Sequence, residues 1–499
     1  MKLAIIYSRA SLGIEAPQVI IEVHISKGLP ALSIVGLPET AIKESKDRVR
    51  SAIINANFEF PVRRITINLA PADLPKKEGG RFDLPIALGI LAASEQIPLA
   101  PLEEYEFAGE LALDGSLRPF NGALPFALAS RKTARSLIVP HDNADESALP
   151  KTIKVFPAKH LLEVCAHLTG TKLLEQHFAS TQQKHTTQLI DICDIRGQQT
   201  AKRAIEIAAA GQHSLLLIGP PGTGKTMLAN RLPTILPEMY DDEALETAAI
   251  YSVSGKKFNA HCWSERPFRA PHHTASSVAL VGGSSPPRPG EISLSHNGVL
   301  FLDELPEFNR AVLESLREPL ESGFVTISRA AYQTRFPAKF QLIAAMNPCP
   351  CGHLGDPRNA CRCTSDQIQR YQTRISGPFL DRIDLCLEVP ALPKNILTRQ
   401  NKNAEISSIV QQRVCAARKI QLARSQKTNA ALFNKEIDKF CAISREDQDY
   451  LENTIERLKL SARAYHRILK VARTIADLDN QEEIQNKHLA EAVSYRRFK

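Results

Sequence analysis

The octapeptide GPPGTGKT has the residue types and the spacing of a nucleotide-binding loop. It matches the pattern G-x-x-x-x-G-K-[ST] at every fixed position. Glycines let such a loop turn its backbone N–H groups toward phosphate oxygens. The lysine neutralises the β- and γ-phosphates, and the hydroxyl completes the shell of a Mg²⁺ ion. The predicted ATP-binding residues are Gly219, Pro220, Pro221, Gly222, Thr223, Gly224, Lys225 and Thr226.

An acidic pair follows a second apolar run. The residues GVLFL at 298–302 predict a buried strand, and this strand ends at Asp303 and Glu304. In P-loop ATPases an acid at such a strand end holds the Mg²⁺ ion. We therefore predict that Asp303, with Thr226, binds magnesium and that Glu304 orients the attacking water. Taken alone, the same string is also typical of a strand that runs into a surface turn.

The run 215–218 (LLLI) before the octapeptide predicts a strand, and 227–230 (MLAN) begins a helix, as a phosphate loop requires. Farther on, 340–346 predicts another buried strand that ends at Asn347. A polar amide there can hold the attacking water or the γ-phosphate. Residues 324–328 and 334–336 predict two strands around a turn, with Arg329 at its tip.

Three arginines follow the nucleotide motifs in chain order. Arg382 precedes a predicted strand and is the first candidate for an arginine finger that reaches a neighbouring subunit's ATP. Arg374 is the second candidate. Arg463 opens a helix near the C-terminus and is expected to reach the γ-phosphate in its own subunit. Any one of these arginines, taken singly, is more typical of a solvated or packing residue, and it is their order after the nucleotide loop that favours these roles.

Four of the ten cysteines crowd into the segment CPCGHLGDPRNACRC. Cys349, Cys351, Cys361 and Cys363 form two C-x-C pairs, and four thiolates on one loop are a ligand set for tetrahedral Zn²⁺. The spacing within each pair is tighter than the usual C-x₂-C. Four ordinary thiols, or two disulfides in an oxidised sample, are the alternatives.

Length and composition predict an ordinary globular protein with more than one domain. The 499 residues are 43% hydrophobic and 23% charged, with a net charge of +8. We expect an α/β or α+β unit at 1–170, a polar linker at 171–190, an ATPase core at 191–395 and an all-helical lid at 396–499. No apolar run has the length of a membrane span, and the N-terminus lacks the pattern of a signal peptide, so we expect a cytoplasmic protein without membrane contact.

The interval between the two nucleotide motifs is long and rich in Gly and Pro, so it cannot be one helix. Long irregular loops inside compact domains are usually functional. Lys256 and Lys257 in this interval are weak support for a polyanion partner, as is the basic surplus of the lid, although that surplus fits a solvated helical surface equally well. The pair His272 and His273 has no other ligand cluster beside it, which favours a structural or interface role over a metal.

The order of these motifs resembles that of the AAA+ ATPases. More narrowly, RPFRAPHH, GEISLSHNGVLFLDELPEF, AAMNPCPCG and SGPFLDRIDL resemble the magnesium-chelatase-like family of bacterial proteins. The resemblance covers essentially the whole chain. It implies a homohexameric ring in which a helix-2 insert (236–295) and a pre-sensor hairpin (324–336) face the pore and handle DNA. It also implies that Asn347 is sensor 1, Arg382 the arginine finger and Arg463 sensor 2.

The N-terminal unit resembles the Lon-type protease fold in KEGGRFDLPIALGI and FAGELALDGSLRPFNGALPFALA. The chain has Arg81 or Phe82 where that protease carries its serine, and Leu124 where it carries its lysine. Without an activated hydroxyl there is no acyl chemistry. We therefore expect a Lon-protease-like α+β domain that serves assembly or DNA contact.

The leading functional hypothesis is an ATP-dependent hexameric DNA motor, a helicase or branch-migration enzyme that acts on single-stranded and branched DNA. Serving recombination during natural transformation is the role that the resemblance implies. A protein-remodelling or metal-inserting ATPase of the same clade is the alternative, and a non-motor ATP switch is the third hypothesis. The chain lacks the DxSxS string of the larger magnesium-chelatase partner, which disfavours porphyrin metallation.

Overall fold

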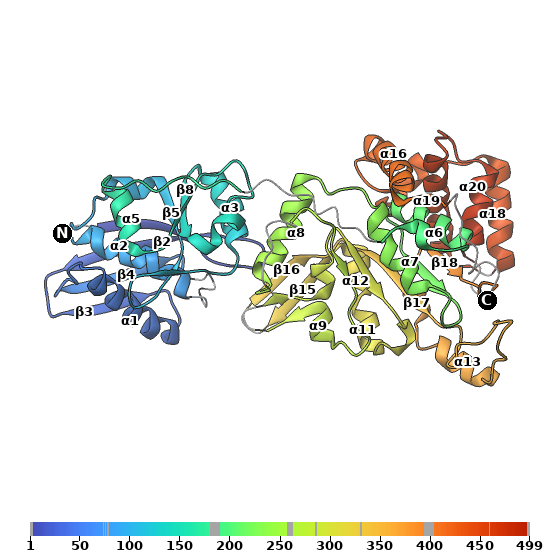
Figure 1. The fold of residues 1–499 in the computed structure, drawn as a ribbon, viewed down its shortest axis with the longest axis horizontal. Helices are drawn as coiled ribbons and strands as arrows, with labels where there is room; N and C mark the ends of the chain where they lie inside the picture. The colour runs from blue at the N-terminus through green and yellow to red at the C-terminus, as the bar shows by residue number, and fades with distance from the viewer. Residues whose placement is uncertain are drawn as a thin grey trace.

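The computed structural model describes residues 3–72, 74, 76, 79–179, 190–256, 263–284, 287–329, 332–393, 404–458 and 460–496. Figure 1 shows an N-terminal lobe in blue and cyan beside a larger lobe that holds the rest of the chain. Most of the expected linker's C-terminal half, 180–189, lies outside the described residues, as does 394–403, where the lid was expected to begin.

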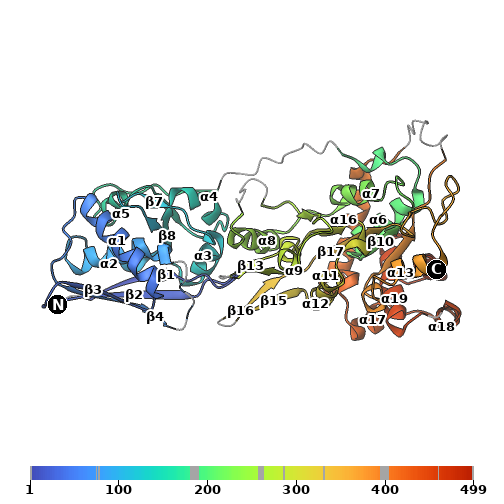
Figure 2. The same cartoon turned by 90° about the horizontal axis from the view of Figure 1, so that it is seen from below.

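The N-terminal lobe is built on a seven-stranded mixed sheet with the order β3-β4-β2-β1-β5-β8-β9. Buried and partly exposed residues alternate along β2, because one face of the sheet packs on the core. Helix α2 is buried along its whole length, and its side chains join those of β1 and β2 in one apolar cluster. Figure 2 shows α1 and α2 together on one side of these strands. The strands are β1 (Leu3–Arg9), β2 (Gln18–Ser26), β3 (Ala31–Val35), β4 (Arg64–Ala70), β5 (Tyr105–Phe107), β6 (Glu110–Leu111), β7 (Leu117–Arg118), β8 (Ser136–Pro140) and β9 (Val155–Ala158). The helices are α1 (Glu39–Asn55), α2 (Asp83–Ala93), α3 (Ala123–Ser130), α4 (Ala144–Ser147) and α5 (Leu161–Leu168).

The second lobe contains a five-stranded parallel sheet with the order β11-β14-β17-β10-β18. Both of its faces are buried: Leu215 and Leu217 of β10 enter one apolar cluster, while Leu216 and Ile218 enter another. Continuous apolar strands are what a parallel sheet covered on both faces needs. All five strands end at one edge of the sheet, where polar loops follow. The strands are β10 (Leu215–Ile218), β11 (Phe268–Arg269), β14 (Val299–Leu302), β17 (Gln341–Met346) and β18 (Leu385–Glu388).

Short elements occupy the long interval and the segment before β17. The interval contains α8, β11, α9, the β12–β13 pair and α10, so it is not one helix, as predicted. The expected strand pair is also present, because β15 and β16 pair antiparallel from Phe324↔Pro337 to Arg329↔Tyr332. These elements are α7 (Lys225–Arg231), α8 (Asp241–Val253), α9 (Ser277–Val281), β12 (Gly282–Gly283), β13 (Arg288–Pro289), α10 (Glu291–Leu294), α11 (Arg310–Ser315), α12 (Arg317–Ser322), β15 (Phe324–Arg329), β16 (Tyr332–Pro337), α13 (Ser365–Gln372) and α14 (Gly377–Leu380).

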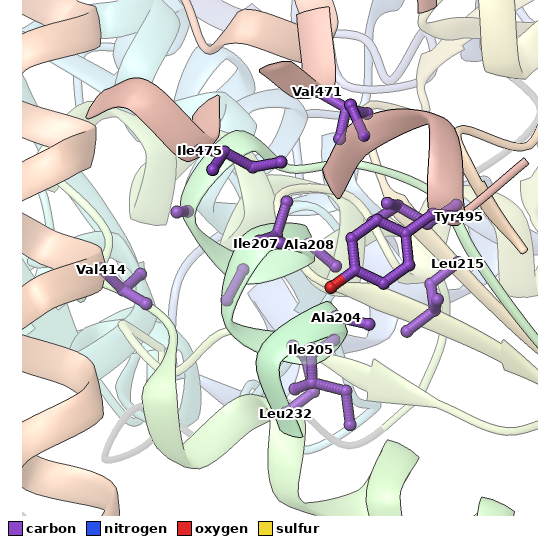
Figure 3. Close-up of a cluster of buried hydrophobic side chains, with 14 of the residues drawn as sticks. Ala204, Ile205, Ile207, Ala208, Leu215, Leu232, Val414, Val471, Ile475 and Tyr495 are labelled. Atoms are coloured by element: carbon purple, nitrogen blue, oxygen red, sulfur yellow. The ribbon is translucent and has the colours of Figure 1, made fainter. Parts of the chain in front are cut away.

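The C-terminal part is helical and packs on the ATPase sheet through α6 (Gln199–Gly211). Figure 3 shows Val414, Val471, Ile475 and Tyr495 around the apolar face of this helix. Arg424 binds Asp477 with both terminal nitrogens at 2.8 Å, and this ion pair joins two helices of the bundle. The helices are α16 (Ser407–Ser425), α17 (Asn434–Phe440), α18 (Arg445–Leu458), α19 (Ala462–Leu478) and α20 (Asn486–Ser494). None of the described helices is long and apolar enough to cross a membrane.

The two lobes meet where α3 packs against α8. Leu124 and Leu149 of the N-terminal lobe share a buried apolar cluster with Leu245, Ala248 and Ala249 of α8. The backbone N–H of Gly122 also donates to the carbonyl of Ser252 at 3.1 Å. The N-terminal lobe is therefore attached to the first helix of the long interval.

Candidate nucleotide-binding and catalytic site

The octapeptide loop connects β10 to α7, as the sequence predicted. The backbone of Gly224 has φ +88°, a conformation that favours glycine, and α7 begins at the next residue, Lys225. A Cβ atom on Gly219 would lie 2.2 Å from the carbonyl oxygen of Val389. These glycines therefore permit the close turn that places the loop at the carboxyl edge of the sheet.

The Lys225 ammonium lies at the centre of this loop. Its Nζ donates to the carbonyls of Gly219 and Pro220 at 2.6 and 2.9 Å, and to Oδ1 of Asn347 at 3.1 Å. Burial lowers the pKa of Lys225, while the charge of Asp303 opposes that shift. The structure thus brings together the predicted loop lysine and the predicted sensor amide, which follow neighbouring parallel strands.

The predicted magnesium ligands also meet. Thr226 donates from Oγ1 to Oδ2 of Asp303 at 2.7 Å, although the two residues are far apart in the sequence. The backbone N–H of Glu304 donates to the other oxygen of Asp303 at 2.9 Å. A hydroxyl and a carboxylate at this distance are oxygen donors of the kind that Mg²⁺ prefers.

Glu304 has a neighbour that the sequence analysis missed. Its Oε2 lies 3.2 Å from Nδ1 of His273, and the His273 ring stands edge-on to Phe308. His273 follows β11, the strand beside β14, so its position at the carboxyl edge of the sheet was available from topology alone. Among the described residues, the group that could hold a metal ion is the four cysteines Cys349, Cys351, Cys361 and Cys363.

The four cysteine sulfurs gather after β17. Cys349, Cys351 and Cys361 have Sγ–Sγ distances of 3.5, 3.7 and 3.6 Å, and all four ligand atoms lie within 4.8 Å of one another. Four sulfurs around one Zn²⁺ ion are expected about 3.8 Å apart, given Zn–S bonds of about 2.3 Å. Backbone hydrogen bonds from His353 and Arg362 lower the pKa of the Cys351 thiol to about 6. The donor set therefore fits zinc.

The cysteine loop packs against the nucleotide-binding loop. Gly352 has φ +82°, and a Cβ atom on it would lie 2.8 Å from Pro221 and 3.8 Å from the Asn347 side chain. Asp356 organises the same loop, since its carboxylate accepts from the backbone N–H of Arg358 at 3.0 Å. These hydrogen bonds hold the pKa of Asp356 below its usual range. The shape of the cysteine loop thus affects residues that touch the predicted phosphate site.

Arg382 lies at the opposite edge of the sheet from the phosphate loop of its own subunit. It precedes β18, whose first residue, Leu385, pairs in parallel with Leu215 at the start of β10, whereas Gly219 follows the end of β10. Within the subunit, Arg382 donates from Nη1 to the carbonyl of Pro378 at 2.7 Å and pairs from Nη2 with Oε1 of Glu321 at 2.6 Å. Arg382 thus faces away from its own nucleotide loop.

Arg463 belongs to this same opposite edge. Its charge is close enough to Arg382 to contribute to lowering the pKa of that arginine. Arg467, one turn along α19, donates to the Arg382 carbonyl at 2.7 Å and pairs with the buried Asp384. The structure thus brings Arg463 together with Arg382 and not with Lys225, Asp303 and Asn347.

Arg374, the second arginine-finger candidate, lies elsewhere. Its Nη1 is 3.0 Å from Oε2 of Glu307 and donates to the carbonyl of Pro306 at 3.4 Å. Both residues directly follow the acidic pair at the end of β14. Arg374 is thus on the catalytic edge of its own subunit, whereas Arg382 lies at the opposite edge of the sheet.

The residues at the predicted protease positions of the N-terminal lobe are buried. Arg81 is buried, and its guanidinium donates to the carbonyl of Asn121 at 2.6 Å and lies over the Phe120 ring. Leu124 is fully buried in the contact with α8. Arg81, Phe82 and Leu124, the residues predicted at the positions of the protease dyad, are all buried, and none of these side chains is an activated hydroxyl.

Comparison with known proteins agrees with this fold and site. Residues 191–397 match a family described as magnesium chelatase, subunit ChlI; residues 21–143 match subunit ChlI of Mg-chelatase, and 404–496 match the C-terminal part of subunit ChlI. The competence protein ComM of Haemophilus influenzae is 54% identical over 99% of this chain and 98% of its own length. The uncharacterized protein YifB of Escherichia coli is 54% identical over 99% of this chain and 97% of its own. Lon protease 2 of Bacillus subtilis is 25% identical over 32% of each chain.

The parallel sheet and its nucleotide loop define the class of protein, which is an AAA+ ATPase. The chain belongs to the magnesium-chelatase-like family and is of the ComM type.

Proposed function

We propose that this protein is an ATP-driven DNA motor that works as a homohexameric ring. One observation carries the ring: Lys225, Asp303 and Asn347 lie at one edge of the sheet, whereas Arg382 and Arg463 lie at the other. One subunit then holds half of a hydrolytic site, and a neighbour supplies the arginines in trans. A head-to-tail contact of this kind closes into a ring when the rotation between neighbours is a whole fraction of a turn, and a hexamer is the ring that the family resemblance implies.

The chemistry follows from the proposed site residues. The loop 219–226 binds the phosphates of ATP, and Lys225 exchanges its carbonyl partners for phosphate oxygens. Thr226 and Asp303 would hold Mg²⁺, which neutralises charge between the β- and γ-phosphates when bound. Glu304 orients the attacking water, and Asn347 holds the water or the γ-phosphate. Arg382 of the neighbour stabilises the charge that develops on the transferred phosphoryl group.

We further propose that the substrate of this motor is DNA. A relative that is 54% identical carries the name competence protein, which supports a role in the uptake and recombination of DNA during natural transformation. Branch migration, or helicase action on single-stranded and branched DNA, fits such a role. A motor with ATP and chromosomal DNA as substrates acts in the cytoplasm. Protein remodelling or metal insertion is the alternative that the experiments below distinguish.

The long interval and the hairpin β15–β16 are the proposed pore loops. Lys256 lies three residues after α8; its side chain is half-exposed, and its Nζ is 3.0 Å from Oε1 of Glu291. Glu291 also binds Arg269 at 2.6 Å, so Lys256 is not its only cation. Lys257 lies outside the described residues, and the side chain of Arg329 at the hairpin end is likewise not described.

Replacing Lys256 and Lys257 with Ala, or Arg329 with Ala, is expected to weaken DNA binding across all sequences. Such contacts go to phosphates, so each lost contact should reduce the slope of log affinity against log salt by about 1. DNA-stimulated ATPase should fall while basal ATPase persists, because the nucleotide residues are unchanged. Titration of labelled single-stranded DNA at several salt concentrations measures the effect. The control replaces Lys256 and Lys257 with Arg, which keeps both charges. If the alanine variants bind DNA with unchanged affinity and unchanged salt slope, the assignment of these residues to the pore is wrong.

We propose zinc as the ligand of Cys349, Cys351, Cys361 and Cys363. The metal would fix the loop that touches Pro221 and Asn347. Purified protein should then hold about one zinc per chain, and chelation or Cys351→Ser should remove it, lower the melting temperature by several degrees and reduce ATP affinity. Cys415→Ser, an exposed thiol outside the cluster, should change none of these values. Protein without zinc whose Cys351→Ser variant melts at the wild-type temperature would contradict the site.

The N-terminal lobe is proposed as a Lon-protease-like domain without catalysis, with the domain limits 1–170, 171–190, 191–395 and 396–499. Its buried contact with α8 supports a role in carrying or orienting the first helix of the proposed DNA-handling interval. Assembly of the ring or contact with DNA is the function that this position favours.

A further inference from the structure

Several arginines gather at the sheet edge opposite the phosphate loop. Around Arg382 lie Arg317, Arg463 and Arg467, and the positive charge of all three lowers the pKa of the Arg382 guanidinium. Burial lowers this pKa further and is the larger cause. Arg467 is neutralised by Asp384, and Arg317 pairs with Glu314 at 2.5 Å. The compensating charge for Arg382 is Glu321.

The contact between Glu321 and Arg382 is short, and only the arginine side chain is buried. Oε1 of Glu321 lies 2.6 Å from Nη2 of Arg382, whose side chain is 8% exposed, whereas that of Glu321 is 56% exposed. The buried Nε of Arg382 has no hydrogen-bond partner within the described part of the chain. The arginine is therefore held in its own subunit by a carboxylate at the surface and by the Pro378 carbonyl, and its Nε–H has no partner among the described residues. A phosphate can replace a carboxylate at a guanidinium, because both present oxygens in the same paired geometry.

Glu321 is also close in sequence to the proposed pore hairpin. It is the second-last residue of α12 (Arg317–Ser322), and β15 begins at Phe324. The hydroxyl of Ser322 accepts from the backbone N–H of Phe324 at 3.2 Å and fixes this junction. The base of the hairpin and the end of α12, which carries Glu321, are therefore joined by a short hydrogen-bonded connection.

We infer that Glu321 is a latch on the trans-acting arginine: it binds Arg382 within the subunit and gives it up to the γ-phosphate of the neighbour's ATP. Movement of the hairpin on DNA pulls Glu321 away and favours this exchange. The inference rests on the proposed trans role of Arg382 and adds its regulation. Glu321 is thus a positioning residue that acts through Arg382.

The test compares the ATPase rates of Glu321→Gln and wild-type rings with and without single-stranded DNA. Glutamine keeps the size of the side chain and removes its charge. The basal rate should rise about fivefold, which corresponds to about 1 kcal/mol; solvent around the exposed carboxylate limits the effect to this size. Stimulation of the ATPase by DNA should fall by the same factor, because Arg382 is then already free of Glu321 before DNA binds.

Two further variants separate a latch from a structural role. Glu318→Gln changes an exposed acid on the same helix and should leave both rates unchanged. Glu321→Gln combined with Arg382→Ala should be as slow as Arg382→Ala alone, because the latch acts only through the arginine. If glutamine at 321 impairs ring formation, Glu321→Ala in rings verified by mass photometry should show the same increase.

A basal rate of Glu321→Gln rings at or below that of the wild type would overturn the latch. An increase that persists in the double variant would also overturn it, since the effect would then bypass Arg382. If Arg382→Ala itself hydrolyses ATP at the wild-type rate, the trans role in the proposed function fails, and this result is distinct from failure of the latch alone.

Discussion

Glu304→Gln is expected to hydrolyse ATP about 10²- to 10⁴-fold more slowly than the wild type while binding ATP with similar affinity. The carboxylate is the group proposed to orient and activate the attacking water, and an amide cannot accept the proton. ATP binding should persist because the substitution leaves Lys225, Thr226 and Asp303 unchanged. The contacts of Lys225 with Asn347 at 3.1 Å and of Thr226 with Asp303 at 2.7 Å are also unchanged. Single-turnover hydrolysis and the affinity for a labelled ATP separate the two effects.

A matched control is Glu307→Gln. Glu307 follows the same strand three residues later, but its carboxylate pairs with Arg374, at 3.0 Å, and not with a nucleotide ligand. This variant should retain most of the hydrolysis rate. Glu304→Gln rings that turn over ATP at the wild-type rate would show that another group orients the water.

Arg382→Ala is expected to lose about 10³- to 10⁵-fold in turnover, the range measured for arginine fingers. Lys225→Ala should be equally inactive, because the phosphates lose their cation. A mixture of the two variants should regain part of the activity, since some interfaces then combine an intact nucleotide loop with an intact arginine. This recovery follows from the placement of Arg382 at the sheet edge opposite the loop.

The mixing experiment needs rings from both variants and a surface arginine as control. Arg370→Ala, on an exposed part of α13, should be active alone and should not change the mixture. If both inactive variants form rings and their mixture recovers nothing, Arg382 does not act across the interface.

Much of the candidate site was predictable because its residues follow parallel strands. Asp303 and Asn347 end β14 and β17, and the carboxyl ends of parallel strands meet at one edge of the sheet. The octapeptide motif added Lys225 and Thr226 at the same edge. The antiparallel pair β15–β16 was predictable from its alternating strand residues and the turn between them.

The remaining contacts depend on packing between segments far apart in the sequence. His273 ends the RPFRAPHH segment, but that motif does not identify Glu304 as its partner, and no motif contains Glu321. Both contacts form only because the sheet and its loops fold together. Arg463 was expected beside the γ-phosphate of its own subunit; helical spacing predicts that it lies on a helix, but the docking of α19 decides which sheet edge that helix faces. The cysteine spacing left zinc and disulfides open, and the sulfur distances favour the metal.

The central claim is that ATP hydrolysis drives movement on DNA, and one measurement tests it most directly. ATPase and branch migration are followed on a labelled four-way junction, with forked and single-stranded DNA in parallel and Glu304→Gln as the inactive reference. The account predicts that DNA raises the ATPase rate and that junctions resolve only when ATP is hydrolysed. If DNA leaves the ATPase rate unchanged and wild-type protein with ATP resolves no more junction than Glu304→Gln, the DNA motor is contradicted.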